Sequence, residues 1–186
     1  MRLILGSKSP RRRELLAGLD IPFEVVDIDA DERCPAELKA GDIPLYISRA
    51  KARAYAKPLH TDELLITADT IVWCDGHMLG KPTDEADARH MLRALSGRTH
   101  QVYTGVTLHY ADGREESFVD ATDVTFRILT EAEIDYYVSR YRPLDKAGAY
   151  GIQEWIGYIG CTSLHGSYFN VMGLPVEKLY EKISLE

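Results

Sequence analysis

Three arginines stand where a short apolar segment should pass into a helix. The stretch LILGSKSPRRRELL runs from Leu3 to Leu16. Ser9 is a favourable N-cap and Pro10 suits the first helical position, so Arg11–Arg13 fall in the first turn. The helix macrodipole already makes that end positive, and acidic residues are preferred there. A local rule broken in this way is typical of a functional site.

A carboxylate interrupts the most strand-like segment of the chain. Residues 63–73, ELLITADTIVW, predict a central strand covered on both faces, and Asp69 lies within it. A buried, isolated carboxylate is unfavourable unless it is neutralised, paired or bound to a cation. Alternatively, Asp69 marks the end of the strand and caps a neighbouring loop. Open α/β sheets bind ligands at strand ends, so either position is compatible with a site.

One lysine is expected at the edge of a buried helix face. A helix over 43–56 places Ile43, Ile47, Ala50 and Ala54 on one apolar face. Lys51 then lies at the margin of that face. A lysine half turned towards the core needs a structural or functional reason.

A second lysine follows a predicted hairpin. Asp75 and Gly76 form a favoured two-residue turn, which pairs residue 74 with 77 and residue 73 with 78. Continuing this register puts Lys81 opposite Thr70, beside Asp69, if the strand ends or bulges there.

The remaining polar segments are weaker signals. Asp31 and Glu32 lie on an acidic loop that follows a predicted strand over 23–26, and such residues are often only solvated. The segments at 96–105 and 145–153 are polar or glycine-rich, as turns commonly are. Taken together, clustered arginines, two unusual lysines and acidic side chains suit a polyphosphate with a divalent metal.

Composition excludes several classes of protein. The chain has 186 residues and a net charge of −7, which argues against a general nucleic-acid or acidic-membrane binder. Cys34, Cys74 and Cys161 are odd in number and widely spaced, so we expect reduced thiols in a cytoplasmic protein. The six histidines include no zinc-protease motif. No segment has the length of a signal peptide or a membrane span.

Strands and helices alternate along the chain and end in a long hairpin. Thr130 and Glu133 form a capping box at the start of one helix. This order predicts a mixed α/β sheet with flanking helices, as one large domain or two closely joined lobes. The strands are expected at 2–5, 23–26, 63–73, 99–110, 117–129 and near 158–164, and the helices at 10–17, 43–56, 83–95, 130–139 and from 176.

Six sequence blocks together resemble one family. They are SKSPRR at 7–12, ADT at 68–70, GKP at 80–82, SGRTHQVYTG at 96–105, DKAGAYGIQ at 145–153 and GSYFNVMGLP at 166–175. In order and spacing they resemble the Maf family. The resemblance implies a single Maf-like domain over residues 1–186, related in fold to the inosine triphosphate pyrophosphatases. It also implies an elongated mixed sheet with two lobes, and a nucleoside triphosphate bound in the cleft between them.

Three residues resemble the branch that hydrolyses dTTP and UTP to the monophosphate and pyrophosphate. They are Arg12, Thr70 and Gln153. A carboxamide at Gln153 can donate to O4 of uracil or thymine and accept from N3–H, whereas a carboxylate can only accept. Glu154 departs from the pattern, because many relatives have glycine there.

The resemblance also assigns roles within the site. Asp69 corresponds to the family's proton acceptor, and it would bind Mg²⁺ or Mn²⁺ together with Glu32. The phosphate-binding residues would be Ser7, Ser9, Arg12, Arg13, Lys51 and Lys81. A homodimer is the family expectation.

Two other functions are weighed against this one. A regulatory module linked to cell division or septum formation would bind a nucleoside triphosphate without hydrolysing it. Single-stranded nucleic-acid binding through Arg11–Arg13 and the eleven tyrosines is disfavoured by the negative net charge. We therefore expect no nucleic-acid partner and no membrane contact.

Overall fold

Strands and helices alternate through most of the chain, and the predicted mixed α/β fold is confirmed. The computed structural model describes residues 1–184. It contains a seven-stranded sheet in the order β2-β1-β3-β5-β6-β7, with β4 paired to β3. The pairs β1–β2 and β1–β3 are parallel, whereas β3–β4 and β6–β7 are antiparallel. The strands are β1 (Arg2–Gly6), β2 (Phe23–Val26), β3 (Glu63–Cys74), β4 (His77–Leu79), β5 (Thr99–Tyr110), β6 (Glu115–Phe126) and β7 (Cys161–His165).

Local sequence signals position most helices correctly. The helix after β1 begins at Pro10 with Ser9 as its N-cap and ends before Gly18, as predicted. The capping box of Thr130 and Glu133 is present in full at the start of α4. The helices are α1 (Pro10–Ala17), α2 (Asp42–Ala54), α3 (Glu85–Leu95), α4 (Glu131–Tyr141), α5 (Trp155–Gly160), α6 (Tyr168–Met172) and α7 (Val176–Ser184), with a 3-10 turn at Ala147–Ala149.

One predicted strand is partly wrong. The strand expected near 158–164 begins only at Cys161, because Trp155–Gly160 forms α5. The sequence WIGYIG contains two glycines together with β-branched and aromatic residues, which disfavour a helix on propensity alone. Ile156 is fully buried in this helix. Tertiary packing therefore outweighs local preference here.

The chain forms two compact units. The first unit comprises Met1–Thr70, Thr104–Asp120 and the segment from Gly173 onward, and the second comprises Ile71–Tyr103 and Ala121–Met172. Strands β3, β5 and β6 contribute residues to both units. A single Maf-like domain over residues 1–186 stays a prediction at this point.

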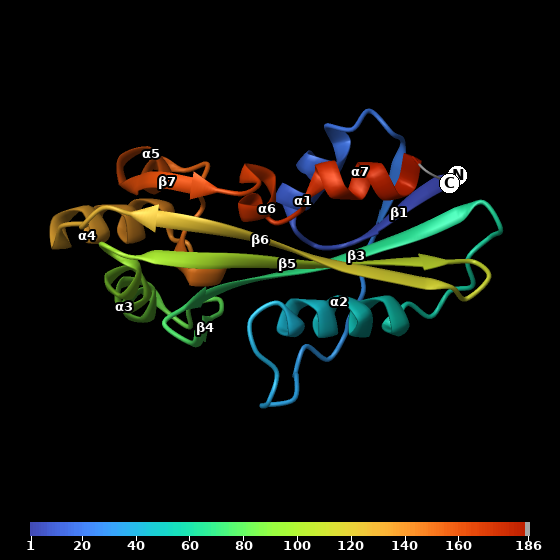
Figure 1. The fold of residues 1–186 in the computed structure, drawn as a ribbon, viewed down its shortest axis with the longest axis horizontal. Coiled ribbons are helices and arrows are strands. Elements are labelled where there is room, and N and C mark those ends of the chain that lie inside the picture. The colour runs from blue at the N-terminus through green and yellow to red at the C-terminus, as the bar shows by residue number, and fades with distance from the viewer. Residues whose placement is uncertain (185–186) are drawn as a thin grey trace. The chain divides into compact units, whose positions relative to one another are not determined.

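In the first unit, helices cover both faces of the sheet. Helix α2 lies on one side of the strands, and α1 and α7 lie on the other (Figure 1). Alternate residues of β3 face opposite sides. Thr67 and Asp69 contact α2, whereas Thr70 contacts α1. The side chains of the consecutive residues Asp69 and Thr70 therefore lie on opposite faces of the sheet.

The second unit has a continuous apolar core. Helix α3 packs against α4 and the 3-10 turn. The largest fully buried side chains in this core are Tyr137, Phe126, Leu92, Leu95 and Ile134.

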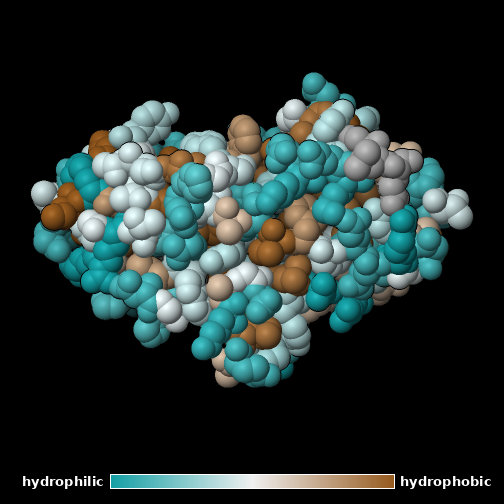
Figure 2. Space-filling view, viewed as in Figure 1, coloured by the Kyte–Doolittle hydropathy of each residue, from teal (hydrophilic) through white to brown (hydrophobic). Residues whose placement is uncertain are grey.

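The space-filling view shows mostly hydrophilic residues at the surface, with hydrophobic ones in small groups among them (Figure 2). Over residues 1–184, no helix has the length and apolar character needed to cross a membrane.

Candidate functional site

Lys51 lies between two carboxylates of the first unit. Its Nζ is 2.8 Å from Oδ1 of Asp69 and 3.0 Å from Oε1 of Glu32. The side chains of Lys51 and Asp69 are only 13% and 14% exposed, whereas that of Glu32 is 56% exposed. The ammonium group therefore compensates the charge that Asp69 brings into an apolar strand. The expected proximity of Lys51 and Asp69 is present.

Buried hydroxyl groups connect the helix of Lys51 to the strand of Asp69. Thr67, two residues before Asp69, donates from Oγ1 to the carbonyl oxygen of Ser48 at 2.7 Å. The Ser48 hydroxyl lies 2.9 Å from that of Thr107 on β5. All three of these side chains are buried. Since Ser48 precedes Lys51 by three residues, these bonds determine how far along β3 the lysine reaches.

Close backbone packing places α2 against β5. A Cβ atom added at Gly105 would lie 2.4 Å from the backbone nitrogen of Leu45 and from the carbonyl of Pro44. Only glycine allows this approach, because a side chain would displace the helix. Gly105 thus contributes to the site without contacting any of its charged groups.

On the opposite face of β3, Arg12 is held by two oxygen atoms. Its Nη2 donates to Oγ1 of Thr70 at 3.0 Å, and its Nε donates to the carbonyl oxygen of Gly173 at 2.8 Å. The Thr70 hydroxyl also lies 2.9 Å from that of Thr104. The third nitrogen, Nη1, has no hydrogen-bond partner among residues 1–184.

Arg12 is a cation with neutral hydrogen-bond partners. Burial lowers the pKa of its guanidinium, and the nearby carboxylate of Asp69 opposes that shift. Arginine stays charged in proteins even so. A positive group held rigidly in this way is well suited to bind an anion.

The start of α1 carries the two predicted serines. Ser9 Oγ accepts from the backbone N–H of Arg12 at 3.4 Å, and Ser7 Oγ accepts from the backbone N–H of Ser9 at 3.2 Å. The side chain of Arg13 is exposed and makes no hydrogen bond or ion pair within the described part of the chain. In the first unit, Ser7, Ser9 and Arg12 are thus joined by local hydrogen bonds.

Lys81 belongs to the second unit, and the register expected for the hairpin is present, but the ladder ends before it reaches Lys81. The predicted pairs Cys74–His77 and Trp73–Met78 are present, but the ladder ends at Val72–Leu79. Strand β4 has only three residues. Pro82 follows Lys81 and has no N–H group to donate to a longer ladder. Lys81 is exposed and does not pair with Thr70 in this ladder.

Gln153, also in the second unit, presents an unsatisfied oxygen. Its Oε1 is buried and has no hydrogen-bond partner among the described residues. A buried acceptor without a partner is unfavourable, and a ligand, an ion or a water molecule commonly satisfies such a group. An N–H group of a ligand would satisfy it.

Several contributing residues were not identified from the sequence. Gly173 acts through a backbone carbonyl, which no side-chain pattern reveals, although it lies in the sequence block at 166–175 and has a φ of 122°. Thr104 lies in a regular strand whose sequence suggests only packing. The block at 96–105 contains Thr104, so the resemblance could have identified it.

The two carboxylates around Lys51 fit a divalent metal. Oxygen atoms of both carboxylates lie within 3.0 Å of the same Lys51 nitrogen, so they are close enough to share one cation. Carboxylate oxygens are the ligands that hard cations prefer. Among residues 1–184, no group of three or more His, Cys, Asp or Glu side chains could hold a metal ion. Mg²⁺ commonly uses one or two protein carboxylates and completes its shell with substrate phosphates and water. The donor set therefore fits a metal that is shared with a phosphate ligand.

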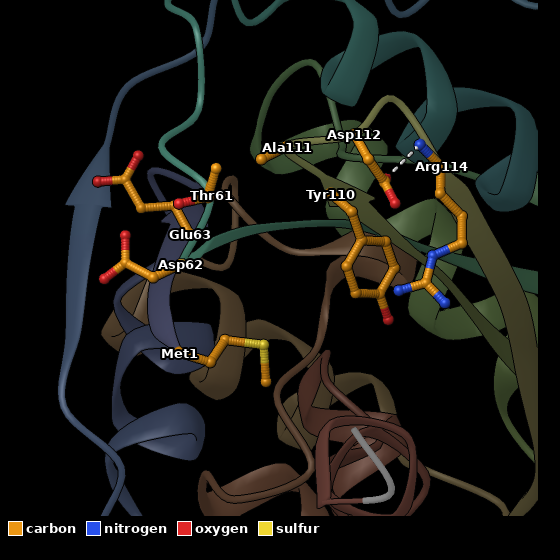
Figure 3. A pocket seen from close by; sticks show the side chains of 8 residues that line it. All are labelled: Met1, Thr61, Asp62, Glu63, Tyr110, Ala111, Asp112 and Arg114. Atoms are coloured by element: carbon orange, nitrogen blue, oxygen red, sulfur yellow. Dashed lines mark hydrogen bonds between the residues drawn. The ribbon is translucent and has the colours of Figure 1, made fainter.

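A separate pocket of about 460 Å³ lies at the other end of β3 (Figure 3). It contains Glu63, which precedes Asp69 by six residues and is therefore about 20 Å away along the strand. None of the predicted site residues lines it. Its lining residues are Met1, Thr61, Asp62, Glu63, Tyr110, Ala111, Asp112 and Arg114.

Comparison with known proteins gives consistent matches over the whole chain. A dTTP/UTP pyrophosphatase of Phocaeicola vulgatus is 57% identical over 183 residues, covering 98% of this chain and 94% of that protein. A protein of the same name from Bacteroides thetaiotaomicron is 55% identical, with the same coverage of 98% and 94%. The solved structure of a HAM1 protein from Coxiella burnetii has a TM-score of 0.52 at 14% identity, covers 100% of both chains, and is similar in fold. The family model for Maf-like proteins matches residues 2–185, and the chain belongs to this family.

Proposed function

We propose that this protein hydrolyses dTTP and UTP to the nucleoside monophosphate and pyrophosphate. The observation that carries the proposal is the placement of Lys51 between Asp69 and Glu32 within one unit that also holds Arg12. Cations for phosphate and carboxylates for water and metal are the groups that this reaction requires. Relatives at 57% and 55% identity bear the name dTTP/UTP pyrophosphatase, which supports the substrate class.

The first unit would bind the triphosphate. Arg12 has a free Nη1 edge, and its other nitrogens are fixed by Thr70 and Gly173. Ser7, Ser9 and the backbone N–H groups at the start of α1 would add hydrogen bonds to phosphate oxygens. Arginines in the first turn of α1 are repelled by the helix dipole, and a bound polyanion would attract both the arginines and the helix N-terminus. Arg13 and Lys81, both exposed, are proposed to bind the same substrate.

Asp69 would orient the attacking water and accept its proton. Water attacks the α-phosphorus, the bond from that phosphorus to the bridging oxygen breaks, and pyrophosphate leaves with the bridging oxygen. Lys51 Nζ, 2.8 Å from Oδ1 of Asp69, would hold that carboxylate in place beside the water. Lys51 and Arg12 would stabilise the charge that develops on the pyrophosphate.

Asp69 and Glu32 would hold Mg²⁺ or Mn²⁺. Bound there, the metal would polarise phosphoryl oxygens and promote deprotonation of water. Because the protein supplies only two carboxylates, the ion would share its shell with the phosphates. Chelation with EDTA should therefore stop turnover and leave the circular dichroism spectrum unchanged.

Gln153 would recognise the base. Its orphan Oε1 could accept from N3–H of uracil or thymine, and its amide group could donate to O4. Guanine presents a different donor and acceptor pattern, so a site with these groups should reject it.

The experiment is a panel of nucleoside triphosphates incubated with Mg²⁺ and assayed for pyrophosphate and monophosphate. We expect dTTP and UTP to be the preferred substrates. Asp69→Asn keeps the size of the side chain and should lower turnover by about two orders of magnitude or more. A mutant with wild-type turnover would remove Asp69 from the mechanism. Binding of UTP without any pyrophosphate release would instead favour a regulatory module linked to cell division.

Location and assembly are further proposals. We infer a cytoplasmic protein that forms a homodimer, in keeping with the nucleotide substrate and the family resemblance. Light scattering of the purified protein measures the assembly directly. A monomer at micromolar concentration would contradict the dimer.

A further inference from the structure

The turn that carries Gln153 is closed by a buried polar network in the second unit. The backbone N–H of Gly151 donates to the hydroxyl of Tyr137 at 3.1 Å. The backbone N–H of Glu154 donates to the carbonyl of Gly151 at 3.0 Å, which closes the turn around Gln153. Tyr137 comes from α4 and is fully buried, so it offers a rigid anchor.

Glu154 completes this network from the other side of Gln153. Its Oε1 lies 2.9 Å from Nζ of Lys146, and the two side chains are only 17% and 12% exposed. Burial raises the pKa of Tyr137, and the charge of the nearby Glu154 carboxylate raises it further. The Tyr137 hydroxyl accepts from Gly151, and the charge of Glu154 acts on the same phenol from nearby. One phenol thus ties together the residues at both ends of the turn.

The packing inside the turn leaves little freedom. A Cβ added at Gly151 would lie 2.5 Å from Oε1 of Glu154 and 3.1 Å from Nε2 of Gln153. A side chain at position 151 would thus displace the ends of the glutamate and glutamine side chains. Gln153 is the one member of this turn whose side-chain oxygen is buried and has no partner within residues 1–184. The other polar groups of the turn are paired with one another or with Tyr137 and Lys146. The Gln153 oxygen is therefore available to a ligand.

We propose that Glu154 and Tyr137 are positioning residues for base selection, which hold the Gln153 amide in the orientation that distinguishes a pyrimidine from a purine. This inference rests on the proposed function, in which Gln153 recognises the base. It gives a specific role to the Glu154 carboxylate, which lies 2.9 Å from Nζ of Lys146. Neither residue touches the substrate.

The test compares the ratio of kcat/KM for UTP to that for GTP in four variants. Tyr137→Phe removes only the hydroxyl, and Glu154→Gln removes only the charge that binds Lys146. Each should lower the ratio by about two- to tenfold, the worth of one hydrogen bond, mainly through KM for UTP. Gln153→Glu should lower it further. Thr130→Ala is the matched control, because it weakens the cap of the helix that carries Tyr137 and leaves the turn intact.

A second measurement reports the turn directly. The side-chain amide NMR signals of Gln153, assigned by their absence in Gln153→Glu, should shift in Tyr137→Phe and in Glu154→Gln without any nucleotide. They should keep their positions in Thr130→Ala.

The outcomes separate the two claims. If Gln153→Glu changes the ratio and neither Tyr137→Phe nor Glu154→Gln does, the positioning role is overturned and base recognition stands. An equal loss in Thr130→Ala also overturns it, because the effect is then general destabilisation. If Gln153→Glu leaves the ratio unchanged, base recognition by Gln153 fails. Unmoved Gln153 signals in both turn variants would overturn the positioning itself.

Discussion

Arg12 donates a hydrogen bond to the hydroxyl of Thr70 at 3.0 Å, across 58 positions of the sequence. These are two of the three residues that resemble the branch acting on dTTP and UTP. Their contact means that the two positions form one structural feature. Thr104 and the carbonyl of Gly173 complete it, since each lies within hydrogen-bonding distance of Thr70.

Thr70→Val should weaken substrate binding. Valine keeps the shape of threonine but removes the acceptor of Arg12 Nη2, so the guanidinium loses one of its two fixed partners. We expect KM for UTP to rise by about three- to tenfold, because the guanidinium keeps its second partner and the loss is that of one ordinary hydrogen bond. Thr70→Ser retains the hydroxyl and should stay close to wild type. Equal KM values for the two variants would contradict this role.

Lys51→Met should destabilise the protein by about 1–3 kcal/mol, because it leaves a largely buried carboxylate at Asp69 without its cation. Urea unfolding measures this, and adding Asp69→Asn to the variant should recover part of the loss. Lys8→Met is a suitable control, since the Lys8–Asp27 pair is 3.1 Å long and both side chains are about two-thirds exposed. Removing such a pair should cost about 0.5 kcal/mol or less. Similar losses in the two variants would show that burial of Asp69 is energetically unimportant.

Gly105→Ala should displace α2 from β5. The added methyl would meet the backbone of Pro44 and Leu45 at 2.4 Å, and backbone cannot rotate away. We expect a loss of about 1–3 kcal/mol in unfolding free energy together with a higher KM, because Lys51 moves with the helix. Gly80→Ala makes the same chemical change where no atom lies within 4 Å. It should behave like wild type, and comparable losses at the two sites would refute the packing argument.

Lowering the pH should reduce the free energy of unfolding, because the buried His100 resists protonation in the folded state. This residue is fully buried, its Nε2 lies 2.6 Å from the Tyr150 hydroxyl, and its Nδ1 has no partner within residues 1–184. Burial lowers its pKa from 6.5 to about 4, although the charge of Asp123 opposes the shift. Between these two values the unfolded chain binds the extra proton and the folded chain does not, so the stabilisation present above pH 6.5 is lost as the pH falls towards 4.

The size of this effect can be measured by urea unfolding. The free energy of unfolding should fall by about 2 kcal/mol between about pH 7 and about pH 5 on account of His100. His100→Gln can keep the bond to Tyr150 and does not titrate in this range. The variant should show a smaller decrease, and an unchanged decrease would assign the acid sensitivity to other groups.

Much of the fold follows from local chemistry that can be read in the sequence. Ser9, Pro10 and Gly18 determine the ends of α1, and Asp75 and Gly76, with φ values of 49° and 79°, form the tight turn between β3 and β4. These signals act within a few residues, so they survive in any tertiary context. Helix α5 has no such signal, because its stability comes from burying Ile156.

The candidate site divides in the same way. The contact between Lys51 and Asp69 was predictable, since a lysine at the edge of an apolar helix face and a carboxylate in an apolar strand each need a partner. The hydrogen bond from Arg12 to the Gly173 carbonyl was not predictable. It joins residues 161 positions apart, and only the tertiary fold brings them together. The network around Gly151 is similar, since Tyr137 reads as an ordinary core residue.

The alternation of Asp69 and Thr70 across β3 carries a constraint on how this gene can change. Inserting or deleting one codon early in the strand would exchange the two side chains, and the carboxylate would then face Arg12 while the hydroxyl faced Lys51. Both partners would lose their match at once. A point substitution at either position removes one half of the site, whereas a change of length by a single residue would abolish both halves together.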